Sequence, residues 1–265
     1  MAINTDNKKG TSNVLAALFA AAHVSPIAEH QLQQYQQDDE GWTLYWQDKT
    51  HSRCDILILA CGHQSQNLPG LAELPLRWTR GQVEQVPSQP PLNQLKTVLC
   101  HKGYLTPAMD NCHALGSTYV KQDDNCDYRL TDQQHNQHTI QKALSGCDWV
   151  KELKFVEQGR AAVRLSTPDH LPLVGQLADW SDWPRRYNDL YKALPVHLYP
   201  DAQYQDNLYC LTGLGSRGLT TAPLLAETLA AQISGEPLPL GQDILDNLTP
   251  QRFLIRALQR RQQQT

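Results

Sequence analysis

The pattern of apolar and polar positions predicts strands of two kinds. Residues 42–46 alternate between apolar and polar after a turn at residues 38–41, and so predict one arm of a hairpin. Residues 55–60 are apolar at successive positions, which favours a strand of a parallel sheet covered on both faces. Residues 208–212 form a second apolar strand that runs into a glycine-rich turn and a helix over about residues 221–233, ended by Gly235.

The middle of the chain predicts an antiparallel sheet of short strands, so the expected fold class is α/β plus antiparallel β. Its strand candidates are residues 79–86, 97–101, 104–107, 114–119 and 153–165. Helices are expected over residues 12–22, capped by Ser12 or Asn13, over residues 131–144, and after Thr249-Pro250. Residues 180–199 predict an irregular surface excursion.

Composition narrows the class of protein. A chain of 265 residues with 40% hydrophobic content suffices for one large domain with a smaller lobe. The net charge of −4 means that a nucleic-acid partner would be held by a local patch. No apolar run reaches 18 residues, and residues 14–22 are too weak for a signal peptide, so we expect a cytoplasmic protein with no membrane partner. Seven cysteines without Cys-x-x-Cys spacing favour neither disulfides nor a metal site.

The turn Gly213-Leu-Gly-Ser-Arg-Gly218 is the strongest chemical signal. Glycines let a ligand approach the main chain, and the helix that follows presents unpaired N–H groups at the positive end of its dipole. The segment therefore predicts a site for an anionic or electron-rich ligand atom. The spacing matches a dinucleotide fingerprint, but no acidic residue ends a strand about 20 residues later, so a pyrophosphate role is rejected. A tight strand–helix connection is the structural alternative.

Six segments occur in a fixed order along the chain, which are Ile56–His63, Arg80-Gly-Gln-Val83, Gly103-Tyr-Leu-Thr-Pro107, Gly116-Ser-Thr118, Arg164–Gly175 and Gly213–Pro223. Their order and spacing resemble the FAD-dependent D-amino-acid oxidase/glycine oxidase family. Three parts are closer still to the oxidoreductase part of a tRNA-modifying member. They are the segment Cys210-Leu-Thr-Gly-Leu-Gly-Ser-Arg-Gly-Leu219, the turn Gly235-Glu-Pro-Leu-Pro-Leu240 and the ending Leu248-x-Pro250-x-Arg252-Phe-x-x-Arg256. The resemblance covers about residues 10–261.

The resemblance implies a partial FAD-binding domain over residues 11–76 and 205–265, with a smaller antiparallel substrate lobe over residues 77–204. Residues 1–10 are expected to be disordered. The family's opening Gly-x-Gly-x-x-Gly turn and ribose-binding acid have no match here, nor does the methyltransferase domain of the tRNA-modifying member. We therefore expect a chain that starts inside the FAD domain and binds FAD weakly or not at all. Whether a companion chain supplies the missing N-terminal FAD segment and methyltransferase domain stays open.

The resemblance also assigns site residues. Arg164 stands at the family's carboxylate-binding arginine, and Tyr104 at a tyrosine that lines the substrate cavity. Their alternatives are an arginine paired with an acid such as Asp169, and a half-buried strand tyrosine. The residues assigned to FAD are Gly62, Arg80, Gly81, Gln82, Gly213, Gly215, Ser216, Arg217, Gly218 and Leu219.

The implied function is FAD-dependent oxidation at the wobble uridine of tRNA. It would remove the carboxymethyl group of 5-carboxymethylaminomethyl-2-thiouridine and leave 5-aminomethyl-2-thiouridine. A small-molecule amine oxidase of the glycine or sarcosine type, and a non-catalytic remnant without flavin, stay open. Arg252, Arg256 and Arg260 recur every four residues, which puts them on one helix face as a tentative tRNA phosphate contact or an ordinary solvated surface.

Overall fold

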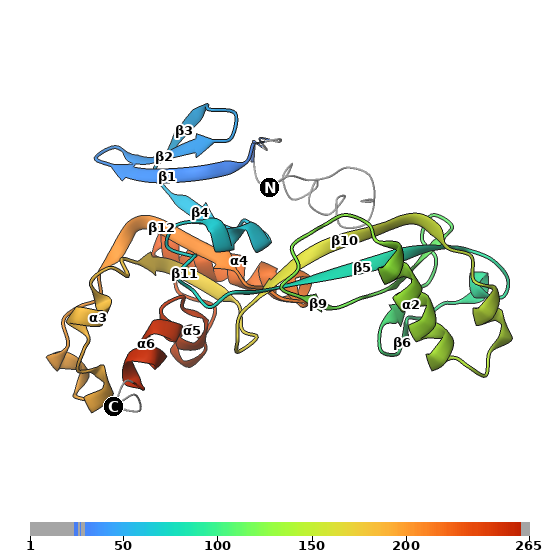
Figure 1. Cartoon of the computed structure of the whole chain (residues 1–265). Coiled ribbons are helices and arrows are strands. Elements are labelled where there is room, and N and C mark those ends of the chain that lie inside the picture. The colour runs from blue at the N-terminus through green and yellow to red at the C-terminus, as the bar shows by residue number, and fades with distance from the viewer. Residues whose placement is uncertain (1–23, 26, 28–29, 261–265) are drawn as a thin grey trace. The chain divides into compact units, whose positions relative to one another are not determined.

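The computed structural model describes residues 24–25, 27 and 30–260, which divide into two compact units (Figure 1). The first unit comprises Met1–Glu73, Gln176–Cys210 and Leu254–Thr265, and the second comprises Leu74–Gly175 and Leu211–Phe253. The expected disorder of residues 1–10 and the expected helix over residues 12–22 lie outside the described residues. Among the described residues, no helix combines the length and apolar character needed to cross a membrane.

The first unit opens with an antiparallel sheet in the order β1-β2-β3, drawn in blue in Figure 1. β1 (Leu32–Asp38) pairs with β2 (Gly41–Trp46) across the turn, and β2 pairs with β3 (His51–Cys54). The predicted hairpin is thereby confirmed. Tyr35 and Trp42 are buried on one face of it, with their ring centroids 5.5 Å apart.

A second sheet has the order β11-β12-β4. It is formed by β4 (Leu57–Leu59), β11 (Leu173–Ala178) and β12 (Tyr204–Thr212), with β4 and β12 parallel as predicted. Leu57 and Leu59 are buried, whereas Ile56 and Ile58 are 41% and 45% exposed. The prediction that this strand is covered on both faces is therefore wrong for the described residues, because alternate side chains point to opposite faces and only one face is packed.

The second unit is built on the antiparallel sheet that the sequence predicts. Its order is β10-β5-β8-β7-β6, and β9 also pairs with β5. In Figure 1, β5 and β10 are the two long arrows that lie side by side. The strands are β5 (Arg77–Pro87), β6 (Leu99–Cys100), β7 (Tyr104–Leu105), β8 (Cys112–Gly116), β9 (Val120–Lys121) and β10 (Val156–Ser166).

The predicted helix over residues 131–144 is α2 (Leu130–Ala143), which contacts β5. The core of this unit is an apolar cluster of buried residues that includes Val86 of β5, Leu105 of β7, Leu115 of β8 and Ile140 of α2. The short 3-10 helices near it are η2 (Leu92–Gln94) and η3 (Asp148–Glu152).

The remaining helices are short except for one. The segment predicted as irregular contains α3 (Trp183–Arg186), η4 (Leu190–Lys192) and η5 (Val196–Leu198), while η1 (Gly62–Asn67) follows β4. The long helix α4 (Gly218–Ser234) ends at Gly235 in a left-handed conformation, as predicted. α5 (Gln242–Leu248) was not expected, and α6 (Arg252–Gln259) begins two residues after Pro250.

Candidate substrate and cofactor site

The arginine expected to bind a carboxylate lies near the end of β10, opposite Thr79 of β5. Its guanidinium passes over Gly81, where an added Cβ atom would lie 2.7 Å from the Arg164 Nη1 atom and 3.2 Å from Cζ. Only a glycine leaves that space open. The long cationic side chain of Arg164 on β10 thus lies over a glycine, Gly81, on the neighbouring strand β5.

The segment after β8 and the strand β7 lie on another side of the Arg164 guanidinium. The Nη2 atom of Arg164 donates a hydrogen bond of 3.3 Å to the hydroxyl of Ser117. Tyr104 is paired with Gly116, and an added Cβ atom at Gly103 would overlap the Gly116 carbonyl oxygen at 2.1 Å. Two glycines thus bring β7 and the segment after β8 together, with Tyr104 beside them.

The charges around Arg164 and Tyr104 favour an anionic ligand. Burial raises the pKa of Tyr104, and the positive charge of Arg164 partly opposes that rise, so the phenol is neutral near pH 7. Asp169, the alternative partner of Arg164, is bound to Arg252 instead. No ion pair joins Arg164 to a carboxylate among the described residues. A half-buried guanidinium that no described carboxylate neutralises suits a bidentate carboxylate ligand.

The glycine-rich turn is attached to β10 one residue beyond this arginine. Gly215 donates its N–H to the Leu165 carbonyl at 2.8 Å, and Ser166 forms a β-bridge with Leu214. Gly213 and Gly215 have φ values of +70° and +58°, a left-handed conformation that glycine adopts without strain. The structure therefore places the predicted cofactor turn next to the strand that carries the predicted substrate arginine.

Helix α4 starts at the end of this turn. No side chain caps its first turn within the described chain, and that turn carries no acidic residue. Ser216 and Arg217 are exposed, and Leu219 is 79% exposed. Unpaired N–H groups at the positive end of a 17-residue helix fit the electron-rich edge of a flavin ring. The residues present thus fit that part of FAD.

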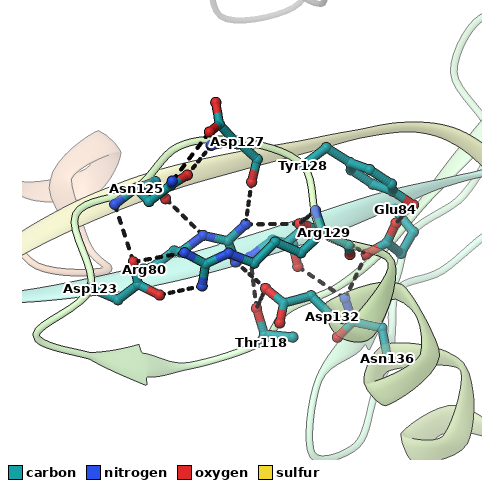
Figure 2. Close-up of polar contacts among 11 residues, drawn as sticks. Arg80, Glu84, Thr118, Asp123, Asn125, Asp127, Tyr128, Arg129, Asp132 and Asn136 are labelled. Carbon is teal, nitrogen blue, oxygen red and sulfur yellow. Dashed lines mark hydrogen bonds and ion pairs between the residues drawn. The ribbon is translucent and has the colours of Figure 1, made fainter.

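Two residues assigned to FAD have a different role. Arg80 is fully buried, and its guanidinium binds Asp132, the Gln82 side chain at 2.9 Å and the backbone carbonyls of Asn125 and Asp127 at 2.7 and 2.5 Å (Figure 2). Gln82 is also fully buried. The assignment of these side chains to a cofactor is corrected to a structural one, because the even positions of β5 face α2, away from Arg164.

The surrounding polar network continues through α2 and the loop before it. The Gln82 side chain donates to Glu84 and to the Arg129 carbonyl, at 3.0 and 2.7 Å. Glu84 also accepts from Asn136 at 3.0 Å and from the Tyr128 hydroxyl at 3.0 Å. The sequence signal for this network was available, since three polar residues recur at alternate positions of a strand. Gly62 begins η1 with φ +58° in the first unit, and its cofactor role stays a prediction.

The tentative arginine stripe is interrupted at its first member. Arg252 is 2% exposed and forms a bidentate ion pair with Asp169, with distances of 3.0 and 2.9 Å, and it also donates to the Leu171 carbonyl at 2.8 Å. Arg256 is half-buried and Arg260 is exposed. The assignment of Arg252 to tRNA phosphates is therefore corrected, because its guanidinium is buried against the loop after β10.

Comparisons with known proteins identify the family and the fold. The model of the FAD dependent oxidoreductase family matches residues 10–232. The tRNA 5-methylaminomethyl-2-thiouridine biosynthesis bifunctional protein MnmC of Pseudoalteromonas atlantica is 57% identical over 211 residues, which are 80% of this chain and 30% of that protein. Its namesake in Shewanella oneidensis is 36% identical over 254 residues, 92% of this chain and 36% of that protein. The chain thus spans about a third of the length of these curated relatives.

Solved structures share the fold at low sequence identity. Glycine oxidase from Geobacillus kaustophilus has a TM-score of 0.69 at 16% identity, covering 91% of this chain and 57% of that one. Iminodiacetate oxidase from Chelativorans sp. has a TM-score of 0.63 at 19% identity, covering 90% of this chain and 58% of that one. These likenesses establish the fold class, which is that of FAD-binding oxidases with a mixed α/β and antiparallel architecture.

Proposed function

The chain belongs to the FAD dependent oxidoreductase family, and from this membership we propose that it oxidises an N–CH2–COO⁻ group on the wobble uridine of tRNA. The observation that carries the proposal is Arg164, a half-buried guanidinium with no carboxylate partner among the described residues, next to the glycine-rich turn. The names of the curated relatives support the tRNA base as substrate. The substrates named for the two solved oxidases, glycine and iminodiacetate, contain the same N–CH2–COO⁻ unit.

The proposed reaction removes the carboxymethyl group of 5-carboxymethylaminomethyl-2-thiouridine. Oxidation of the N–CH2 bond to N=CH releases two electrons and two protons, and water then splits the imine into a primary amine and glyoxylate. When bound, FAD accepts the two electrons with the hydride of the CH2 group. The product, 5-aminomethyl-2-thiouridine, lacks one methyl group of the 5-methylaminomethyl base that the relatives' name contains.

The residues of this chain orient the substrate. Arg164 binds the carboxylate through two parallel N–H bonds, a geometry that a lysine cannot reproduce. The neutral Tyr104 forms one side of the site and adds no negative charge that would repel the ligand. The Gly213–Gly218 turn and the N-terminus of α4 would hold the flavin edge and stabilise negative charge there as electrons arrive.

The direct experiment has two stages. Because the sequence predicts weak FAD binding, the purified chain is first titrated with FAD, followed by visible absorbance, to find the concentration that saturates it. The loaded chain is then mixed with tRNA that carries the carboxymethylaminomethyl base, and glyoxylate is measured in a single turnover. We expect stoichiometric glyoxylate from the parent and little from Arg164→Ala or Arg164→Lys. Arg185→Ala, at an 82% exposed side chain of the first unit, is the control that should match the parent.

A small-molecule amine oxidase is the second candidate. The same arginine recognises only the N–CH2–COO⁻ unit, which glycine and sarcosine also carry. A substrate exchange separates the two functions. Turnover of free glycine at rates that exceed those of the modified tRNA would favour the small-molecule function, whereas glyoxylate from tRNA alone would favour the proposed one.

A further inference from the structure

We propose that Ser117 is a positioning residue for the Arg164 guanidinium, and that Thr118 and Asp132 fix Ser117 from the opposite face of β5. The inference deepens the proposed function in one respect, since it takes the ligand of Arg164 to be a carboxylate. The positioning itself is a property of the protein without ligand.

The first step is the contact between Ser117 and Arg164. The Ser117 hydroxyl accepts from Nη2 at 3.3 Å, while the other side of the guanidinium lies against the empty position of Gly81. An arginine side chain has four rotatable bonds, and within the described part of the chain no charged partner restrains that of Arg164. A single fixed hydroxyl at one nitrogen therefore selects the rotamer in which the remaining N–H groups face the ligand.

The second step fixes the backbone that carries Ser117. Thr118 exchanges two hydrogen bonds with Gln82 of β5. The Thr118 N–H donates to the Gln82 carbonyl at 3.2 Å, and the Gln82 N–H donates to the Thr118 hydroxyl at 2.9 Å. The segment after β8 is thus held to β5 at the point where Gly81 faces Arg164.

The third step connects this segment to α2. The Thr118 hydroxyl donates to Asp132 Oδ2 at 3.3 Å, and the same oxygen is bound by the fully buried Arg80. Figure 2 shows Thr118 and Asp132 beside Arg80, on the α2 side of the strand. A hydroxyl that accepts one bond and donates another has a fixed direction, so the place of Thr118 depends on Asp132.

These contacts connect the buried Arg80–Asp132 ion pair to the guanidinium of Arg164, where the ligand would bind. Asp132 and Thr118 belong to the face of β5 that packs on α2, whereas Ser117 and Arg164 belong to the opposite face. A change at Thr118 or Asp132 should therefore weaken carboxylate binding although neither side chain touches the ligand. The loss of carboxylate affinity should have about the same size as the loss caused by removing the Ser117 hydroxyl.

The test uses two probes of the chain at a saturating FAD concentration, glycine and glycinamide, in which an uncharged carboxamide replaces the carboxylate. Their affinities are measured by calorimetry for the parent and four variants, which are Ser117→Ala, Thr118→Val, Thr118→Ser and the control Ser145→Ala. We expect glycine to bind about tenfold more weakly to Ser117→Ala and Thr118→Val, the size of one hydrogen bond to a charged group. Thr118→Ser and Ser145→Ala should stay within twofold of the parent, and glycinamide should be unaffected throughout.

A second readout needs no ligand. The ¹⁵N–¹H signal of the Arg164 Nε group, assigned by its loss in Arg164→Lys, should shift or broaden in Ser117→Ala and Thr118→Val but not in Thr118→Ser. If the parent does not bind glycine but the signal behaves in this way, the positioning stands, and glyoxylate release from the modified tRNA decides the proposed function separately. If Thr118→Val does not fold, Ser117→Ala carries the test, because it removes one oxygen from a half-buried side chain. An unmoved signal and unchanged glycine affinity in Ser117→Ala would overturn the proposal.

Discussion

The substitution Asp132→Ala tests the buried polar network on the α2 side of β5. It leaves the Arg80 guanidinium, which is 0% exposed, without its counterion. Removal of one member of a buried ion pair costs about 3–5 kcal/mol of unfolding free energy. Two backbone carbonyls and the Gln82 side chain still accept from Arg80, so we expect the lower end of that range, about 3 kcal/mol.

The measurement is urea unfolding of the full chain at pH 7, followed by circular dichroism. The same loss should lower the thermal midpoint by roughly 6–12 °C for a chain of this size. Asp148→Ala is the matched control, because Asp148 pairs with Lys151 at side chains that are 93% and 67% exposed, and such a pair contributes little. The double variant Arg80→Met/Asp132→Leu should recover much of the lost stability, since it removes both charges together.

An Asp132→Ala variant that unfolds at the same urea concentration as Asp148→Ala would contradict this prediction. A double variant less stable than Asp132→Ala would contradict it too, since the loss would then come from packing rather than from an uncompensated charge.

Three further predictions concern the site and its surroundings. Gly81→Ala should raise the KM for a carboxylate substrate about tenfold, because its methyl group would lie 2.7 Å from Arg164 Nη1 and displace the guanidinium. Arg252→Gln should cost about 3 kcal/mol in urea unfolding by breaking the buried pair with Asp169, and should leave the salt dependence of tRNA binding unchanged. Arg164→Gln should raise the pKa of Tyr104 further in a ¹³C-tyrosine NMR titration, because the opposing positive charge is lost.

The first two of these predictions have the following contrary outcomes. An unchanged KM in Gly81→Ala would mean that Arg164 does not contact the carboxylate. A flatter salt slope in Arg252→Gln would return that arginine to the tRNA surface. The raised pKa of Tyr104 also affects stability with a definite sign. In the folded state this pKa lies above the ordinary value of 10.0, so its contribution to stability is full below pH 10 and is lost as the pH rises through the folded-state pKa. Tyr104→Phe should therefore unfold with less dependence on pH in the alkaline range.

Features with a local pattern were predictable from the sequence. The glycine-rich turn and α4 follow from glycine spacing next to an apolar strand and helix, and the structure places them there. The hairpin of β1 and β2 follows from period-two alternation around a turn. Both signals depend on residues that are close in sequence, so no knowledge of distant contacts was needed.

Roles that depend on distant contacts were not predictable. Arg80 and Arg164 are both strand arginines in matched motifs, and only the register between β5 and β10 puts them on opposite faces. The spacing of four after Pro250 correctly predicted a helix. It could not reveal that Arg252 meets Asp169, which lies 83 residues earlier. Burial by a distant loop therefore turned a predicted surface charge into a structural one.

Anaerobic mixing of the FAD-loaded chain with tRNA carrying 5-carboxymethylaminomethyl-2-thiouridine tests the proposed function most directly. We predict bleaching of the visible flavin absorbance, with one glyoxylate released per flavin reduced. Arg164→Ala should slow the bleaching about a hundredfold or more, because two charge-assisted hydrogen bonds to the carboxylate are lost. A flavin that stays oxidised in the presence of the modified tRNA, or an Arg164→Ala variant that is reduced as fast as the parent, would contradict the proposed function.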